Sequence, residues 1–133
     1  MRVTVHVDGG ARGNPGPAAA AAVISTPDGE VVDEAMEVLG EQTNNVAEYR
    51  GLLLGLRRAR DLGATEVEVV NDSELVAKQL TGTYKVKHAG LRPLYVEAMR
   101  ELRGFERWSV RSVPRAQNAH ADALVNQALD AVA

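Results

Sequence analysis

The first strand of a sheet is predicted by the stretch Arg2-Val3-Thr4-Val5-His6-Val7-Asp8, in which polar and apolar residues alternate. A period of two places successive side chains on opposite faces of a strand, so one face of this strand is expected to be buried. Residues 9–17, which follow, contain four glycines and two prolines and are therefore predicted to form a loop. Asp8 is thus expected to lie where the strand ends.

Two further strands are predicted directly after this loop. Residues 18–25 form a strand of small residues, and residues 30–39 alternate roughly between polar and apolar. Between them, Pro27-Asp28-Gly29 is typical of a tight turn. The two strands are therefore expected to form a hairpin.

The hydrophobic period changes to three or four residues at Thr43, which predicts a helix. The helix is expected to end near Leu62, because Gly63 follows, and Thr43 or Asn44 is suited to cap its first turn. Its apolar positions are Val46, Tyr49, Leu53, Leu56 and Ala59.

The rest of the chain alternates strands and helices. A strand is predicted over residues 65–71, a short helix over 73–80, a helix over 88–102, a strand over 108–113, and a last helix capped by Asn118. This order indicates an α/β protein, with a mixed sheet and helices packed on its faces. Since no repeat or long linker divides the chain, residues 1–133 are expected to form one domain.

Composition excludes several classes of protein. The chain has no cysteine, which excludes disulfides, thiolate metal sites and cysteine nucleophiles. No apolar run is long enough to span a bilayer, and the sequence enters a strand pattern directly, without the features of a signal peptide. We therefore expect a soluble cytoplasmic protein without a membrane partner.

The charge balance at first disfavours a nucleic-acid partner, because such domains are usually basic. Here 15 basic and 18 acidic residues give a net charge of −3. The basic residues gather between residues 82 and 115, and the flanking segments are acidic. The basic segment is either a partner-binding face or a solvated helix face, and charge alone favours the second interpretation.

Four carboxylates occupy positions at which a site could form. Asp8 and Asp72 each end a predicted strand, at the sheet edge where crevices form in α/β proteins. Glu48 and Asp122 each lie in the first turns of a predicted helix. Taken singly, each has an ordinary structural explanation, as a turn-forming aspartate or as an acid favoured by the helix dipole.

Together the four carboxylates would suit metal-assisted phosphodiester hydrolysis. Two divalent ions ~3.5–4 Å apart activate water and stabilise the leaving oxygen, and Mg²⁺ prefers oxygen ligands. An acidic site is then compatible with a polyanionic substrate. The segments Gly13-Asn14-Pro15-Gly16 and Thr43-Asn44-Asn45 would add neutral donors for phosphate and sugar hydroxyls, although the first alone is equally a rigid turn.

Five separated motifs, in this order, resemble the ribonuclease H type 1 family across essentially the whole chain. They are Val7-Asp8-Gly9-Gly10, Arg12 through Pro17, Thr43 through Tyr49, Asp72-Ser73, and Asn118 through Leu124. The resemblance implies a five-stranded mixed sheet of order 3-2-1-4-5 with helices on both faces. It also implies endonucleolytic cleavage of the RNA strand of RNA–DNA hybrids, leaving a 5′-phosphate, by a monomer that uses two Mg²⁺ or Mn²⁺ ions.

The same resemblance assigns roles to individual residues. Asp8, Glu48, Asp72 and Asp122 would be the catalytic, metal-binding carboxylates, with Asp8 bridging both ions. The residues expected to bind the hybrid are Gly13, Asn14, Thr43, Asn44, Asn45, Lys85, Lys87 and Arg115. Lys85 and Lys87 belong to a segment that resembles the short bacterial and archaeal form of the family, actinobacterial relatives included, which lacks a basic protrusion.

The sequence departs from the family in the loop before the last helix. Many members carry a histidine there, whereas residues 114–117 contain none, and Arg115 is a candidate substitute. His120 lies on the helix and is expected to be a surface residue. Two alternatives remain open: a module that binds hybrid or double-stranded RNA without cutting it, and a domain that belongs to a longer polypeptide.

Overall fold

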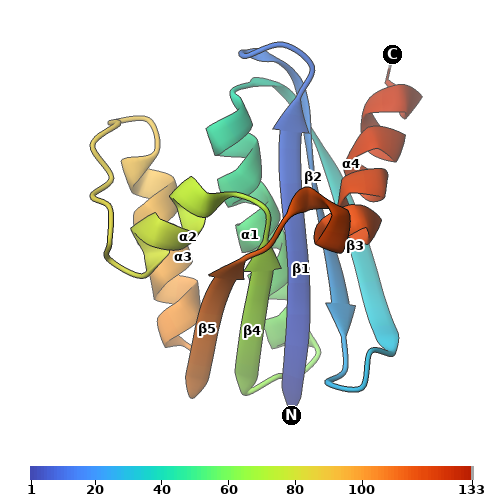
Figure 1. Ribbon diagram of the computed structural model, residues 1–133, viewed down its shortest axis with the longest axis vertical. Helices are drawn as coiled ribbons and strands as arrows, with labels where there is room; N and C mark the ends of the chain where they lie inside the picture. The colour runs from blue at the N-terminus through green and yellow to red at the C-terminus, as the bar shows by residue number, and fades with distance from the viewer. Residues whose placement is uncertain (133) are drawn as a thin grey trace.

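A computed structural model describes residues 1–132 of the chain, and its centre is a five-stranded sheet (Figure 1). Strands β1 and β2 and strands β2 and β3 pair antiparallel, whereas β4 pairs parallel with both β1 and β5. The observed order β3-β2-β1-β4-β5 confirms the expected mixed sheet. The strands are β1 (Arg2–Ala11), β2 (Gly16–Ser25), β3 (Val31–Gln42), β4 (Glu66–Asn71) and β5 (Arg107–Ser112).

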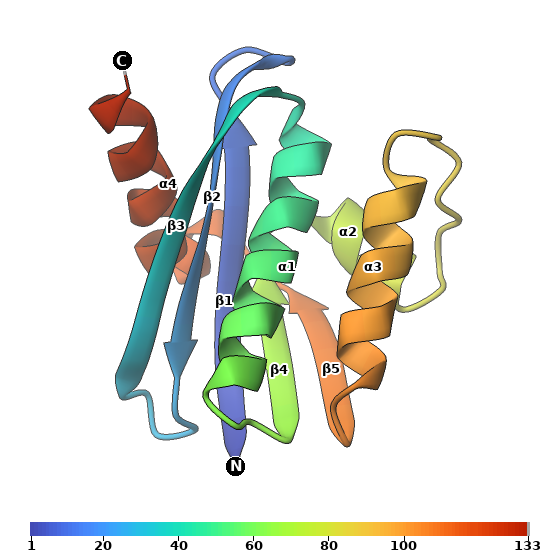
Figure 2. The same ribbon diagram turned by 180° about the vertical axis from the view of Figure 1, so that it is seen from behind.

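Helices cover both faces of this sheet, as expected. The views from the front and from behind place α4 on one face and α1 with α3 on the other (Figures 1 and 2). Within residues 1–132, none of the helices combines the length and the apolar character needed to cross a membrane. The helices are α1 (Asn44–Asp61), α2 (Glu74–Leu80), α3 (Arg92–Arg103) and α4 (Ala119–Ala131), and a 3-10 turn (Arg115–Asn118) precedes α4.

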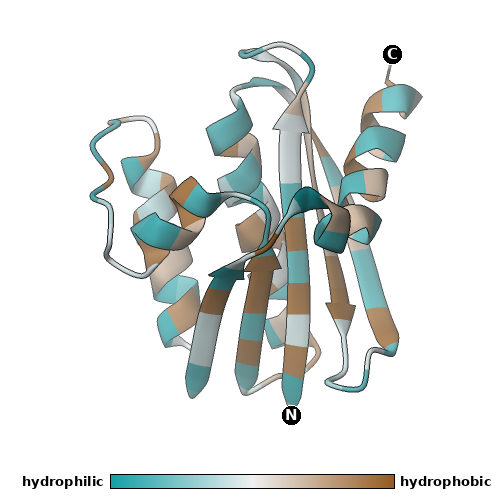
Figure 3. Cartoon of the chain, in the orientation of Figure 1, coloured by the Kyte–Doolittle hydropathy of each residue, from teal (hydrophilic) through white to brown (hydrophobic). Residues whose placement is uncertain are grey.

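The larger core lies between the sheet and helices α1 and α3. Val3, Val5 and Val7 of β1 point into it, and the polar residues between them point away, which gives β1 its alternating bands of hydropathy (Figure 3). Leu52 and Leu56 of α1 lie against these valines and are fully buried. Burial of each such side chain contributes about 1.5–3 kcal/mol, so this face fixes α1 along β1.

A second core holds α4 on the opposite face. Its strand side consists of the small residues Ala19 and Ala21 with Val23, all on β2. Leu124 and Val125 of α4 pack directly onto them. Because alanine projects little beyond the backbone, α4 lies close to the sheet, and Asp122 in its first turn is brought near β1.

Several predicted boundaries were wrong, among them the end of the strand predicted over residues 30–39, which continues to Gln42 as β3. Strand β1 continues to Ala11, three residues beyond Asp8, because Gly9, Gly10 and Ala11 pair with alanines of β2. Helix α3 begins at Arg92 rather than His88. Pro93 lacks the N–H group that a helix interior needs and fits only into the first turn, while the preceding residues form a turn in which the Gly90 N–H donates to His88 Nδ1 at 3.0 Å.

Candidate active site

The parallel pairing of β1 and β4 brings Asp8 and Asp72 together. The register runs from Arg2 opposite Glu66 to His6 opposite Val70. Two residues further along the chain come Asp8, still on β1, and Asp72, the first residue after β4. A step of two returns each side chain to the same face of the sheet. The two carboxylates consequently lie beside each other and line the same pocket.

Direct backbone contact between α1 and β1 brings Glu48 to the same place. A Cβ atom on Gly9 would lie 2.0 Å from the Ala47 carbonyl oxygen, and one on Gly51 would lie 2.3 Å from the Asp8 carbonyl oxygen. Any side chain at these two positions would push the helix away from the strand. The glycines thus allow the first turns of α1, including Glu48, to rest on the part of β1 that carries Asp8.

Asn118 anchors the beginning of α4, and with it Asp122. It occupies the expected N-cap position, but its side chain makes no capping hydrogen bond. Instead its Nδ2 donates to the Val7 carbonyl oxygen at 2.9 Å, and the residue is 1% exposed. The residue before Asp8 and the residue that starts α4 are therefore tied together, one helical turn from Asp122.

All four predicted carboxylates line one pocket of about 400 Å³. They come from β1, from α1, from the residue after β4, and from α4. The other lining residues are Gly9, Gly10, Ala11, Arg12, Asn44, Arg115, Val125, Asn126 and Leu129. The pocket surface is mostly polar, and side chains far apart in the sequence have converged on it as expected.

Burial, together with the neighbouring charges, raises the pKa values of Asp8, Glu48 and Asp72. Burial, followed by the charge of Asp72, raises the pKa of Asp8 to about 8. Burial also raises the pKa of Glu48 and that of Asp72, although the guanidinium of Arg115, 3.8 Å from Asp72 Oδ2, acts in the opposite direction. Without a cation in the pocket, Asp8 therefore holds a proton near neutral pH.

The metal-free protein should therefore lose stability as pH rises from about 4 to 8. The pKa of Asp8 is higher in the folded than in the unfolded chain, so its stabilising contribution is complete below its ordinary pKa of 3.8 and is lost as pH passes about 8. We expect the thermal midpoint measured with chelator to fall by about 5 °C or more across this interval. Millimolar Mg²⁺ should remove most of the fall, and a midpoint independent of pH would contradict the assignment.

The pocket is chemically suited to hard divalent cations. Glu48 Oε2 and Asp72 Oδ2 are buried and have no hydrogen-bond partner among residues 1–132, so both oxygens remain available as ligands. In the same range, no three acidic or histidine side chains are already gathered into a compact cage for one ion. Mg²⁺ does not require such a cage, because it retains several waters and combines one or two carboxylates with substrate phosphate oxygens.

Asn14 and Asn44 form a linked pair beside the carboxylates. The Asn44 side-chain oxygen accepts from the Ala11 N–H at 2.8 Å, and the Asn14 side-chain oxygen accepts from the Asn44 N–H at 3.1 Å. These bonds join the end of β1, the following turn and the start of α1. Both oxygens are thereby engaged, which leaves the two NH₂ groups as donors for a ligand.

Except for Arg115, the remaining predicted binding residues do not line the pocket. Thr43 caps α1 by accepting from the Val46 N–H at 3.3 Å, while Gly13 and Asn45 flank the asparagine pair in the chain. Lys85 and Lys87 are exposed on the connection between α2 and α3 and do not line the pocket. His120 is also outside it, with Nε2 3.1 Å from Glu34 Oε2.

Sequence reasoning missed Arg12 as a pocket residue. Its guanidinium lines the pocket and binds Asp130 of α4 at 2.6 Å, which joins the turn after β1 to the last helix. Its position two residues before Asn14, inside a recognised motif, was a usable signal. Asn126, whose Nδ2 donates to the Asp122 carbonyl oxygen at 3.1 Å, gave no such signal.

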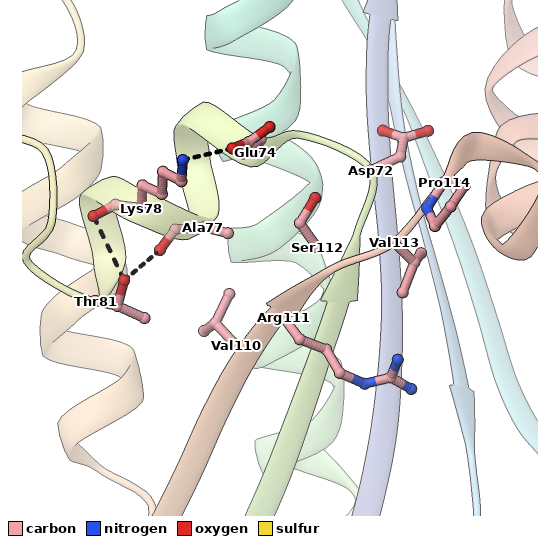
Figure 4. Close-up of a pocket in the computed structure, with 10 residues that line it drawn as sticks. All are labelled: Asp72, Glu74, Ala77, Lys78, Thr81, Val110, Arg111, Ser112, Val113 and Pro114. Carbon is pink, nitrogen blue, oxygen red and sulfur yellow. Dashed lines mark hydrogen bonds and ion pairs between the residues drawn. The ribbon is translucent and has the colours of Figure 1, made fainter.

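A larger cavity of about 600 Å³ lies beyond Asp72, between α2 and the end of β5 (Figure 4). It contains only one of the four carboxylates, and its cations already have acidic partners. Lys78 binds Glu74, and Arg111 lies 3.5 Å from Glu68. Among the pockets of the described residues, the four carboxylates come together only in the smaller, polar pocket.

Comparison with known proteins gives one family model, described as reverse transcriptase-like, which matches residues 6–128. A bifunctional protein of Mycobacterium tuberculosis is 51% identical over 134 residues, which are 100% of this chain and 37% of that protein. Ribonuclease HI of Halobacterium salinarum is 47% identical over 97% of this chain and 65% of its own length. The chain thus spans less than two thirds of these relatives.

The solved structures that superpose on this chain include ribonucleases H, as do the relatives found by sequence. The crystal structure of the Halobacterium salinarum ribonuclease H1 superposes with a TM-score of 0.95, at 47% identity, and covers 98% of each chain. LC11 ribonuclease H1, crystallised in complex with an RNA/DNA hybrid, superposes with a TM-score of 0.93 at 38% identity, again over 98% of each chain.

Proposed function

The chain belongs to the ribonuclease H family, and on that premise we propose that it hydrolyses the RNA strand of RNA–DNA hybrids, using two divalent ions and leaving 5′-phosphate ends. The observation that carries the proposal is the convergence of Asp8, Glu48, Asp72 and Asp122 on one pocket from four separate elements. A relative with 38% identity was crystallised with such a hybrid, which supports the choice of substrate.

The four carboxylates would hold Mg²⁺ or Mn²⁺. When bound, the ions supply charge neutralisation at the attacking and leaving oxygens of the phosphodiester. The charges of both Asp72 and Asp122 act on the buried carboxylate of Asp8, so Asp8 would be a central ligand of the metal site. Binding would release the protons that the crowded carboxylates otherwise hold, since only ionised carboxylates are good ligands.

Neutral donors beside the carboxylates would distinguish RNA from DNA. The free NH₂ groups of Asn14 and Asn44 suit the 2′-hydroxyls of the RNA strand, because that hydroxyl accepts as well as donates hydrogen bonds. Thr43, Asn45 and the backbone of Gly13 would contact the nucleic-acid backbone. We place Lys85 and Lys87 against phosphates farther from the cleaved bond, as their exposed positions allow.

Arg115 would take the place of the histidine that the loop lacks. Its guanidinium is 80% exposed and faces Asp72, so it is free to move toward a phosphate. It would attract the phosphate without transferring a proton, because arginine stays charged.

The pocket is complete within one chain, and cysteine is absent, so we propose that the active species is a cytoplasmic monomer.

Purified protein incubated with an end-labelled RNA–DNA hybrid should cut the RNA strand only when Mg²⁺ or Mn²⁺ is added. The 5′ ends of the products should carry phosphate, detectable by their resistance to kinase labelling before phosphatase treatment. Single-stranded RNA and a DNA duplex of the same sequence serve as controls and should remain intact.

Two results would contradict the proposal in different ways. Hybrid binding without cleavage at any concentration of either metal would favour a binding module over an enzyme. Cleavage that persists in excess chelator would remove the role of divalent ions while leaving the nuclease.

A further inference from the structure

A small cavity of about 10 Å³ lies behind the carboxylates, on the core side of β4. The strand register places Asn71 in the same row as the buried residues Val67 and Val69, so its side chain points to this side of the sheet. Apolar atoms of Val7 and Val76 close the cavity, and the remaining lining residues are Asp8, Glu48, Asn71, Asp72 and Ser73.

Asn71 is 4% exposed, and its two polar atoms are unequally satisfied. The side-chain oxygen accepts from the Ser73 N–H at 3.0 Å, which fixes the orientation of the amide. The Nδ2 group is buried and has no partner within residues 1–132. A buried donor without a partner costs about 1–3 kcal/mol, so a partner is expected in the cavity that Asn71 lines.

Glu48 has a buried acceptor that lacks a donor, as Asn71 has a buried donor that lacks an acceptor. Its Oε2 atom is also buried and without a partner in the described part of the chain, and Glu48 lines the same cavity. The structure contains no direct hydrogen bond between the two residues. A volume near 10 Å³ is about the smallest that accommodates one water molecule, and such waters bridge polar groups that would otherwise be unsatisfied.

We propose that Asn71 is a positioning residue for Glu48, acting through one buried water. Asn71 Nδ2 donates to the water, and the water donates one hydrogen to Glu48 Oε2. Asp72 and Ser73, which line the cavity too, offer oxygens to its second hydrogen. The bridge holds the Glu48 carboxylate at one distance from β4 before any ion arrives. The role of the bridge, which is to position a metal ligand, rests on the proposed function. The geometry of the bridge does not depend on it.

The first test uses the metal-free protein. Asn71→Leu removes the donor at nearly constant volume, Glu48→Ala removes the acceptor, and the double variant completes a cycle of thermal midpoints. If the bridge exists, the double variant should lose clearly less than the sum of the two single losses. Additive losses would overturn the proposal, since Asn71 would then act only through its turn with Ser73.

A direct observation accompanies the cycle. NMR exchange spectra of the wild type should contain a cross-peak between the Asn71 side-chain amide and a long-lived water, and Glu48→Ala should weaken it. Absence of that cross-peak in a spectrum that resolves the amide would also overturn the proposal.

The second test measures metal binding. Asn71→Leu should weaken Mn²⁺ affinity, measured by calorimetry, about 10-fold, as loss of an outer hydrogen bond typically does. Asn71→Thr, which keeps a short donor, should recover most of it. Val67→Ala, a core variant on the same strand, should lower the thermal midpoint but leave Mn²⁺ affinity unchanged. Equal weakening by Val67→Ala would show that destabilisation alone accounts for the effect.

The proposed function and the proposed role of Asn71 can each be disproved without the other. If the wild type neither bound Mn²⁺ nor cleaved a hybrid, the proposed function would fall. The thermal cycle and the water cross-peak would still decide the role of Asn71.

Discussion

Replacing Asp8 by asparagine should reduce hybrid cleavage about 10³-fold or more while making the metal-free protein more stable above pH 7. The loss corresponds to about 4 kcal/mol of transition-state stabilisation, within the range that bound metal ions supply. The gain in stability arises because Asp8 is 7% exposed and lies against Asp72 and Asp122. Asparagine keeps the shape and removes a buried charge. Single-turnover cleavage and thermal unfolding in chelator measure the two effects.

The matched control is Asp28→Asn, which makes the same chemical change in the exposed turn between β2 and β3. It should leave cleavage unchanged. Because the Thr26 hydroxyl holds the pKa of Asp28 below its ordinary value, it should also leave the pH dependence of unfolding above pH 4 unchanged. If Asp8→Asn kept full activity, the assignment of Asp8 to the metal site would be wrong. If it lost activity and also unfolded more easily at pH 8, Asp8 would be a structural residue.

Opposite effects on activity and stability are expected of a site built from like charges. The two strands, helix α1 and helix α4 are each held by apolar packing, and that packing forces the carboxylates together. The carboxylates therefore repel one another in the folded protein, and a bound metal ion or a proton relieves this repulsion. Arg115 relieves part of it at Asp72, from a position too exposed to replace an ion.

Much of this arrangement could be predicted from the sequence because the signals are local. Hydrophobic periodicity located β1, β3, β5, α1 and α4, and runs of small or β-branched residues located β2 and β4. Gly63 and Thr43 marked the ends of α1. Asp8 and Asp72 come after equivalent runs of strand residues, and the parallel pairing of β1 with β4 places such residues side by side. Convergence of all four carboxylates on one pocket was expected from their chemistry and from the family motifs.

The features that the sequence did not reveal depend on partners distant in the chain. Nothing near Asn118 indicates that its side chain bonds to Val7, 111 residues away, rather than to its own helix. Asn71 resembles an ordinary turn residue until the cavity beside Glu48 is seen. The extension of β1 through Gly9 and Gly10 was missed because glycines usually end strands, and here the alanines of β2 pair with them.

The site depends on the close backbone contact between Gly9 of β1 and the first turns of α1, and Gly9→Ala should disrupt that contact. The new methyl group would lie 2.0 Å from the Ala47 carbonyl oxygen and 2.6 Å from the Glu48 backbone nitrogen. Neither atom belongs to a flexible side chain, so the first turns of α1 must move away from β1. We expect a loss of about 3 kcal/mol in the free energy of unfolding, at the upper end for overpacking.

Activity should fall with it, because the displaced segment carries Glu48. A shift of ~1 Å in a catalytic group costs about 100-fold in rate, so the folded fraction of Gly9→Ala should cleave the hybrid at least that much more slowly. Gly10→Ala is the matched comparison: the nearest atom to its new methyl group is 3.8 Å away, in ordinary contact. Denaturant unfolding should separate the two variants clearly. Equal stability would mean that α1 does not rest on β1 at Gly9, and Glu48 would then have no fixed place beside Asp8.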